Sequence, residues 1–328
     1  MYQVITIGDA VVDTHVAIDN ASVECDVNTH ECQLCLDYAS KIPITDSFQT
    51  LGGNAANVAC GSAKLGLKTA VLATVGKDSN GRMITQELKR QKVSTELINA
   101  DAATKTRYSV ILNFRGERTI LSYHEKRKYR WPKIMPPTEW IYFTSLSDGY
   151  ELLQDNLITY LEKHPAIKVA FNPGSFQLKS SLGRVKEMVT RADILIINLE
   201  EAEKILNTTL AKEKTLTAII HGLLGLGAKE VVITDAARGA VAGNEEEIWS
   251  IASFPVKVVA KTGAGDAFSA AYLSARIYEH DIAHALSWGI SNSSSVITEY
   301  GAQKGLLDEN GVKKMMSKFS SIRAKKIA

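Results

Sequence analysis

The sequence predicts an α/β fold in which a mostly parallel, doubly wound sheet is flanked by helices on both faces. Apolar, β-branched runs of strand length alternate along the chain with segments that place apolar residues at three- and four-residue spacing. The composition is that of a globular protein, with 328 residues of which 45% are hydrophobic and 23% are charged. Because strand and helix alternate, the strands are expected to run parallel with crossover helices between them.

Six apolar runs are expected to form the strands of this sheet: Val4–Gly8, Thr69–Val75, Trp140–Thr144, Ile167–Phe171, Ile194–Ile197 and Val231–Thr234. The segments with helical spacing are Ala55–Leu65, Ile84–Lys92, Leu152–Leu161, Lys186–Val189, Leu216–Leu226, Ala267–Tyr278, Ile282–Thr298 and Val312–Ile322. No repeat or linker divides the chain, so residues 1–328 are interpreted as one domain.

Two stretches, from about 14 to 50 and from about 105 to 125, hold strand-like alternation without intervening helices. In the second, Arg115-Gly116-Glu117 resembles a hairpin turn between two such strands. We expect the two stretches to pair into one small antiparallel sheet inserted in the α/β core. Such a sheet serves as a lid or as a contact between subunits, so a homodimer through the lid is expected.

The charge balance indicates which partners to exclude. Lys plus Arg number 38 and Asp plus Glu number 36, so the formal net charge is +2. This balance predicts no binding to nucleic acid or to an anionic membrane, both of which need a concentrated basic surface. No apolar run approaches the roughly 18 residues of a membrane span. With no visible signal peptide, the expected compartment is the cytoplasm.

Three of the four cysteines lie close together, Cys25, Cys32 and Cys35, with His30 between them. A C-x2-C pair with a third Cys and a His has the ligand types of a tetrahedral zinc site. It is half of the usual motif of two matched pairs, and we therefore favour reduced thiols over zinc.

The most informative motif is Thr262-Gly263-Ala264-Gly265-Asp266, which follows the strand-like Phe254–Val259 and opens a helix. Small residues let the amides of 263–265 point at one place, where the helix dipole adds positive potential, so this loop is a candidate anion site. A carboxylate there fits chemistry in which Asp266 accepts a proton from an attacking hydroxyl while the amides hold a phosphoryl group. The alternative is a helix N-terminus whose Asp only complements the dipole.

A second glycine cluster, Gly52-Gly53-Asn54-Ala55-Ala56-Asn57, precedes another helix of small residues. Paired glycines let the backbone approach a ligand, and Asn57 can present an amide to hydroxyls. Asp9 and Asp13 follow the first strand, where ligands of open α/β sheets bind, so either carboxylate could hold hydroxyls. Each of these residues is equally compatible with a turn or a helix cap.

Together and in this order, these motifs resemble those of the ribokinase-like (PfkB) carbohydrate kinase family over nearly the whole chain. The matching segments are Asp13 after the first strand, Gly52-Gly53-x-x-x-Asn57, Val75–Gly81, Asn198-x-x-Glu201, the strand ending at Thr234, Gly263-Ala264-Gly265-Asp266 and Gly301-Ala302-Gln303.

The resemblance implies an enzyme that transfers the γ-phosphoryl group of ATP, with Mg²⁺, to a hydroxymethyl group of a ribose- or fructose-like sugar or related polyol. It implies that Asp266 is the base and that the amides of Gly263, Ala264 and Gly265 form the anion hole. The remaining assignments are Asp13, Gly52, Gly53, Asn57 and Arg107 to the acceptor pocket, Asn198, Thr234, Gly239 and Asn292 to the nucleotide, and Glu201, through water, with Asn198 to Mg²⁺.

Three features depart from the family pattern. One is the cysteine-bearing stretch from about Ser22 to Tyr38, which is longer than expected before the lid strand and could cover the acceptor pocket, contact a second subunit or hold zinc. Ala260 replaces an Asp that helps to bind a monovalent cation in ribokinases, so dependence on such a cation is not expected. Lys261 is a hypothetical substitute for the charge of that cation. Ala236 replaces a glycine of the family's T-x-G-x-x-G motif, so the backbone there must avoid positive φ or bear strain.

Other functions stay open. A nucleoside kinase of the same family is possible because the Gly52–Asn57 segment is similar to the version in nucleoside-phosphorylating members. Four lid aromatics either stack a base or fill the sheet: Tyr108, Phe114, Tyr123 and Tyr129. A catalytically silent sensor on the same fold would need neither the base Asp266 nor the metal-organising pair Asn198 and Glu201. A dinucleotide oxidoreductase would need a G-x-G-x-x-G turn after the first strand, which is absent.

Overall fold

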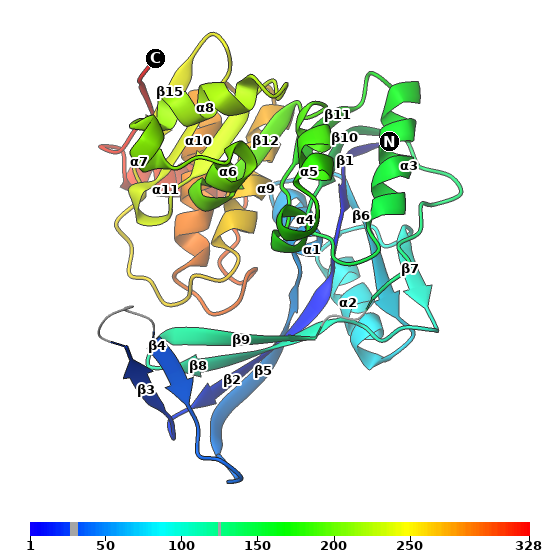
Figure 1. Cartoon of the computed structure of the whole chain (residues 1–328), viewed down its shortest axis with the longest axis vertical. Helices are drawn as coiled ribbons and strands as arrows, with labels where there is room; N and C mark the ends of the chain where they lie inside the picture. Colours follow the sequence, from blue (N-terminus) through cyan, green and yellow to red (C-terminus); the bar gives the residue numbers. More distant parts are fainter. Residues whose placement is uncertain (27–31, 124–125) are drawn as a thin grey trace.

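A computed structural model describes residues 1–26, 32–123 and 126–328. Its main sheet has ten strands in the order β16-β15-β14-β13-β12-β11-β10-β1-β6-β7 (Figure 1). In that order the strands span Lys325–Lys326, Ile248–Ile251, Ala240–Gly243, Val231–Thr234, Ile194–Asn198, Lys168–Phe171, Thr138–Phe143, Tyr2–Ile7, Thr69–Gly76 and Ile98–Asp101. All six predicted strands are confirmed.

The pairs from β7 to β13 are parallel, and only the edge pairs from β13 to β16 are antiparallel. From β1 the chain runs to β6 and β7 at one edge and then returns to β10 on the other side of β1. The sheet is therefore doubly wound, as predicted, and its switch point lies between β1 and β10.

Helices cover both faces because successive strand residues point to opposite sides. One face packs against α3 (Glu151–Lys163), α5 (Leu182–Val189), α6 (Leu199–Leu206) and α8 (Leu216–Leu224). The other packs against α1 (Asn54–Lys64), α9 (Ala264–Ile277), α10 (Ile282–Val296) and α11 (Glu309–Lys318). The remaining helices are α2 (Ser79–Arg90), α4 (Ser175–Ser180), α7 (Leu210–Glu213) and the 3-10 turn Ala236–Arg238. No helix among the described residues is long and apolar enough to cross a membrane.

A four-stranded sheet projects from the core and is called the lid here (Figure 1). Its order is β5-β2-β8-β9, with bounds Ile44–Gly52, Val11–Ile18, Tyr108–Phe114 and Glu117–Tyr123. The expectation of a purely antiparallel sheet is wrong, because β2 and β8 pair in parallel. Arg115 and Gly116 form the predicted hairpin turn with φ of 48° and 82°.

Two local expectations are also wrong. Asp13 does not lie in a turn after the first strand but is the third residue of lid strand β2. The segment Phe254–Val259 is not a strand. The amide of Val259 donates instead to the carbonyl oxygen of Ile297. Pro255 lacks a donor, which disfavours a paired strand there.

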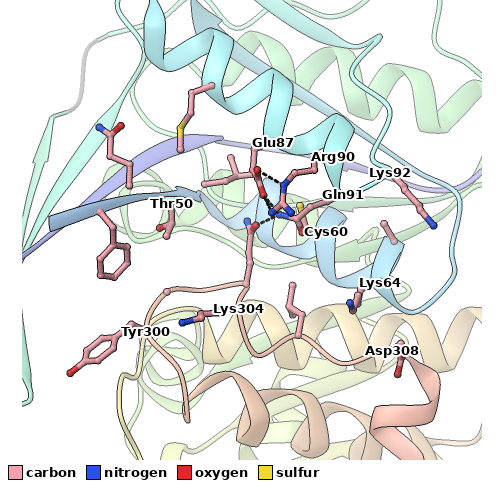
Figure 2. Close-up of a pocket in the computed structure, with 18 of the residues that line it drawn as sticks. Thr50, Cys60, Lys64, Glu87, Arg90, Gln91, Lys92, Tyr300, Lys304 and Asp308 are labelled. Atoms are coloured by element: carbon pink, nitrogen blue, oxygen red, sulfur yellow. Dashed lines mark hydrogen bonds and ion pairs between the residues drawn. The ribbon is translucent and has the colours of Figure 1, made fainter. Parts of the chain in front are cut away.

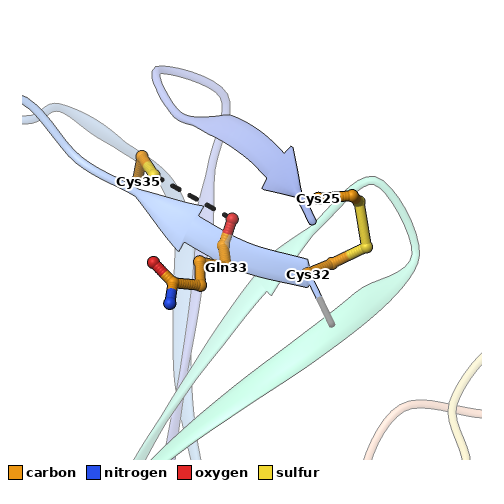
Figure 3. Close-up of a disulfide and its surroundings, with 4 residues drawn as sticks. All are labelled: Cys25, Cys32, Gln33 and Cys35. Atoms are coloured by element: carbon orange, nitrogen blue, oxygen red, sulfur yellow. Dashed lines mark hydrogen bonds between the residues drawn. A yellow bond between two sulfur atoms is a disulfide. The ribbon is translucent and has the colours of Figure 1, made fainter. Parts of the chain in front are cut away.

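The cysteine segment forms a hairpin of its own, β3 (Ser22–Cys25) and β4 (Cys32–Cys35), beside the lid (Figure 3). Cys25 and Cys32 are joined by a disulfide, whereas reduced thiols were expected. Cys35 is a free thiol that faces the carbonyl oxygen of Gln33. His30 lies outside the described residues, and among those described no cluster of three or more His, Cys, Asp or Glu side chains is arranged to hold a metal.

Ala236 bears the backbone strain that the sequence allowed. Its φ is 45°, in the left-handed region that costs a residue with a Cβ about 1–2 kcal/mol. A glycine at this position would avoid that cost, but part of the stabilisation would be offset because glycine loses more chain entropy on folding. Ala236→Gly is therefore expected to raise the free energy of unfolding by about 0.5 kcal/mol in urea titration. The neighbouring Ala237→Gly should lower it, and equal destabilisation by both variants would contradict the strain.

Candidate active site

The candidate site lies beyond the carboxyl ends of the parallel strands, beneath the lid. Asp9 follows β1 at the switch point, where open α/β sheets bind ligands. Asn198 ends β12 and pairs in register with Thr234 at the end of β13. The sheet thus brings the predicted acceptor residues and the predicted nucleotide residues to the same edge.

Asp266 lies in the first turn of α9 and is 8% exposed. Its two carboxylate oxygens accept hydrogen bonds from Asn54 Nδ2 at 3.0 Å and from Asn57 Nδ2 at 2.7 Å. Burial raises the pKa of this carboxyl to about 6, the Asn57 and Asn54 hydrogen bonds oppose the rise, and the charge of Asp13 adds to it. A carboxylate with such a pKa is ionised at neutral pH and accepts a proton more readily than an exposed one.

The loop before α9 has the shape that the anion hole requires. Gly263 caps the helix with φ of 77°, and a Cβ there would lie 2.4 Å from the Cβ of Ala302. At Gly265 a Cβ would meet nothing within 4 Å, so this turn borders open space. The helix start therefore presents its free amides next to Asp266.

The paired glycines are explained by close approach. A Cβ at Gly52 would lie 2.1 Å from Asp13 Oδ2, so only glycine allows this carboxylate to pack on β5. Gly53 has φ of 93° and abuts the backbone of Asp9. Asp13 is itself buried, and this burial raises the pKa of its carboxyl. The Asp13 carboxylate thus lies on a face of the lid from which its charge acts on Asp266.

Arg107 is buried and does not line open space. Its Nη1 donates to Asp9 Oδ2 at 2.5 Å and to the Tyr129 hydroxyl at 2.9 Å. The Tyr129 hydroxyl donates to the other oxygen of Asp9 at 2.9 Å. These hydrogen bonds hold the Asp9 carboxylate in place, and Arg107 is 1% exposed.

The residues predicted to bind the nucleotide divide into exposed and internal ones. Asn198 Oδ1 accepts from the Glu201 amide at 2.9 Å, and Glu201 Oε2 accepts from the Asn198 amide at 3.0 Å, a reciprocal cap on α6. Burial raises the pKa of the Glu201 carboxyl. Mg²⁺ is commonly held by one or two carboxylates with phosphates and water, so this pair fits the ion.

Gly239 and Asn292 are occupied by internal contacts. A Cβ at Gly239, whose φ is 104°, would lie 2.0 Å from the carbonyl oxygen of Ile251. The buried Asn292 side chain donates to the Ala267 carbonyl at 2.8 Å and accepts from the Leu307 amide at 2.9 Å. Both residues were expected to bind the nucleotide, and both are buried within the fold.

The lid presents one face to the site, and sequence reasoning missed two of its features. Strand alternation and register place Asp13, His15, Phe48 and Arg118 on the same face. Arg118 Nη1 donates to the Thr262 hydroxyl, next to the anion-hole loop. His15 and Phe48 stack with ring centroids 4.6 Å apart.

Tyr108, Tyr123 and Lys261, which were considered for contacts with ligands, contact other parts of the lid instead. Tyr108 and Tyr123 stack on each other on the opposite face of the lid, 5.3 Å apart. The exposed Lys261 lies 3.7 Å from Glu117 Oε1 of β9, so its charge is directed to the lid.

The pKa of Asp266 predicts a pH dependence. A base must be deprotonated to act, so kcat/KM is expected to rise with pH through about 6 and to level above it. ATP titrates in the same range, and Asn54→Ala separates the two groups. Loss of the Asn54 hydrogen bond raises the pKa of Asp266 alone, so the rise of kcat/KM with pH should move to higher pH in this variant. A rise at the same pH in wild type and in Asn54→Ala would show that Asp266 is not the titrating base.

A helix start that presents its amides beside a buried carboxylate is an arrangement compatible with phosphoryl transfer to a hydroxyl. The family model described as pfkB family carbohydrate kinase matches residues 13–309. The chain therefore belongs to this family.

Individual relatives agree with this assignment. The chain is 23% identical to an ATP-dependent 6-phosphofructokinase of Thermoanaerobacterium thermosaccharolyticum, over 96% of this chain and 94% of that protein. It is 28% identical to a ribokinase of Bacillus subtilis, over 85% of this chain and 92% of that protein. The structure of an Arabidopsis thaliana ribokinase complexed with ribose and ATP superposes with a TM-score of 0.77 at 20% identity, covering 96% of this chain and 98% of that one.

Proposed function

We propose that this protein transfers the γ-phosphoryl group of ATP to a hydroxymethyl group of a ribose- or fructose-like sugar or a related polyol. The single observation that carries the proposal is Asp266, a buried carboxylate held by two asparagine amides beside the free amides of α9. The family match and the sugar-kinase names of the relatives support the choice of donor and acceptor.

In this proposal each residue has one task. Asp13 and Asn57 bind acceptor hydroxyls between the lid and α1. Asp266 takes the proton from the attacking hydroxyl as the oxygen–phosphorus bond forms, and the bond from the γ-phosphorus to ADP breaks. The amides of Gly263, Ala264 and Gly265 hold the charge that develops on the phosphoryl oxygens.

Glu201, through water, and Asn198 are the residues that would hold Mg²⁺ near Thr234. When bound, the ion neutralises phosphate charge. No activating monovalent cation is part of the proposal, because Ala260 supplies no carboxylate.

The experiment is a coupled assay of ADP release with ATP and Mg²⁺ against sugars, sugar acids, polyols and nucleosides. Turnover that depends on one sugar or polyol is expected. Binding of a panel member without turnover would contradict the proposal and favour a silent sensor. Where no member binds, the panel is extended to phosphorylated sugars, and failure there would contradict the assignment of a sugar acceptor.

A nucleoside acceptor is the second candidate, and one observation favours it. The Phe48 ring on the site-facing side of the lid is 37% exposed and stacked on His15, which makes it available to a base. Base–aromatic stacking contributes about 1–3 kcal/mol, so Phe48→Leu is expected to raise KM for a nucleoside about tenfold. A KM that rises no more for nucleosides than for sugars would contradict this acceptor.

A homodimer through the lid and a cytoplasmic location complete the proposal. Exposed apolar side chains lie on the face of the lid opposite the site, Tyr108 and Leu121, and Ile44 is exposed at the start of β5. Sedimentation equilibrium should give twice the chain mass of 35.8 kDa, and a mass of one chain would contradict the dimer. The cytoplasm is proposed because ATP is the donor.

A further inference from the structure

A row of side-chain amides leads from Asp266 to a groove on the outside of the site. The groove has a volume of about 1020 Å³ and lies between α1, α2, β5 and residues 300–308. Figure 2 shows Glu87, Arg90 and Gln91 meeting in it through hydrogen bonds. None of these three residues belongs to the acceptor or nucleotide positions.

The links of this row are direct. Arg90 holds both oxygens of Glu87, at 2.6 and 2.8 Å. Gln91 Nε2 donates to Glu87 Oε1 at 2.8 Å and to Gln303 Oε1 at 2.5 Å. Gln303 Nε2 donates to Asn57 Oδ1 at 2.8 Å. Asn57 Nδ2 then donates to Asp266 Oδ2 at 2.7 Å.

The orientation of each amide in this row follows from the two carboxylates, Glu87 and Asp266, that end it. An ionised carboxylate only accepts hydrogen bonds, whereas a side-chain amide has one donor end and one acceptor end. Glu87 therefore takes the donor end of Gln91, whose second N–H meets the oxygen of Gln303. That leaves the Gln303 nitrogen for the oxygen of Asn57, and the Asn57 nitrogen for Asp266. With Gln303 removed, the oxygen of Asn57 loses its donor, and only the hydrogen bond to Asp266 itself still orients the amide.

We propose that Gln303 and Gln91 are positioning residues that hold the Asn57 amide with its N–H toward Asp266 and so keep this carboxylate ionised and oriented. They reach Asp266 only through the Asn57 amide. The inference rests on the proposed function only for the role of Asp266 as base. In this inference, two glutamines in the groove, Gln303 and Gln91, influence the proton affinity of the buried Asp266 carboxylate.

The other groups that face Asp266 are distinct from the row. Asn54 donates to it from α1, the charge of the Asp13 carboxylate on β2 raises its pKa, and its own charge raises the pKa of the buried Tyr142 hydroxyl on β10. A change confined to Gln303 leaves these three groups in place. A change in the proton affinity of Asp266 in such a variant therefore reports on the row.

The experiment reads the proton affinity of Asp266 without any substrate. Protein labelled with [4-¹³C]aspartate is titrated by carboxyl ¹³C NMR, and the resonance is assigned by its absence in Asp266→Asn. Wild type should titrate near 6. Gln303→Met should titrate about one pH unit higher, because one hydrogen bond to the charged form is no longer held. Gln303→Glu should titrate higher still, because a new carboxylate takes the donor of Asn57.

The matched controls are Gln49→Met and Gln49→Glu. Gln49 lines the same groove but donates to Thr14 and has no link to the row. They should leave the resonance of Asp266 unchanged. Gln91→Met, at the outer end, should shift it in the same direction as Gln303→Met and serves if the Gln303 variants do not fold. An unshifted resonance in the folded Gln303 or Gln91 variants, or an equal shift in the Gln49 controls, would overturn the proposal.

Kinetics supply a second readout once an acceptor is known. Gln303→Met should lower kcat/KM about tenfold at a pH below both pKa values and leave it near wild type at alkaline pH. A loss that is the same at every pH would indicate a merely structural role and overturn the proposal. Absence of turnover in wild type would contradict the proposed function, whereas the NMR titration would still decide the role of the row.

Discussion

Asp266→Asn is expected to lower kcat by about 10²–10⁴-fold with the phosphate acceptor, the range that a positioned general base contributes. The amide is close in size to the carboxylate but cannot take a proton from the attacking hydroxyl. ATP binding should persist, because the change leaves the α9 backbone in place. The measurement is steady-state turnover with saturating ATP and acceptor.

The control for this variant separates chemistry from folding. Its melting temperature and its affinity for ATP should stay close to those of wild type while turnover is lost. Turnover within threefold of wild type would contradict Asp266 as the base. A second carboxylate, Asp13, would then be examined by the same substitution.

Gly263→Ala is expected to lower kcat by about 10²–10³-fold, which is the usual cost of misplacing one donor of an anion hole. A Cβ at this position would lie 2.4 Å from the Cβ of Ala302 and 2.5 Å from its Cα, so the backbone has to move. The φ of 77° adds strain for any residue other than glycine. The amides at the start of α9 therefore shift away from the phosphoryl group, and turnover reports the shift.

Gly183→Ala in α5 is the matched control, because a Cβ there meets only one atom, 4.0 Å away. Alanine also favours a helix more than glycine does, so this variant should be as active and at least as stable as wild type. Full activity in Gly263→Ala would contradict the assignment of the loop as the anion hole.

The buried parallel strands were predictable because burial on both faces leaves an unbroken apolar run. All eight residues of β6 are buried, and the sequence there reads as one continuous strand. The strands β14 to β16 carried no such signal, since they are two to four residues long and pair antiparallel rather than through crossovers. Phe254–Val259 has strand-like composition but no partner strand, and composition alone does not reveal partners.

The close approaches in the candidate motifs were predictable because a glycine at such a position has a physical reason of its own. Gly52, Gly53 and Gly263 each lie where a Cβ would clash, so the residue type itself marks close approach. Asp13 was expected in the turn after the first strand, yet it lies in β2 against a glycine that makes room for it. The spacing of residues along the chain reveals the glycine motifs, whereas the position of Asp13 in a strand depends on tertiary packing.

Long-range polar contacts were beyond any reading of one sequence. Asn57 and Gln303 are 246 positions apart, and neither periodicity nor motif spacing relates them. Arg118 and Thr262 are 144 positions apart and meet only because the lid folds over the start of α9. The ion pair of Arg107 with Asp9 is a third case, since burial of both groups depends on the closed fold.

The most direct test of the account is ³¹P NMR of a reaction that contains the protein, ATP, Mg²⁺ and the acceptor found in the panel. The account predicts that the γ-phosphate signal is replaced by a phosphomonoester of the acceptor and by ADP in equal amounts, and that Asp266→Asn leaves the spectrum unchanged. Release of inorganic phosphate in place of the ester, or ester formation at the wild-type rate by Asp266→Asn, would contradict it.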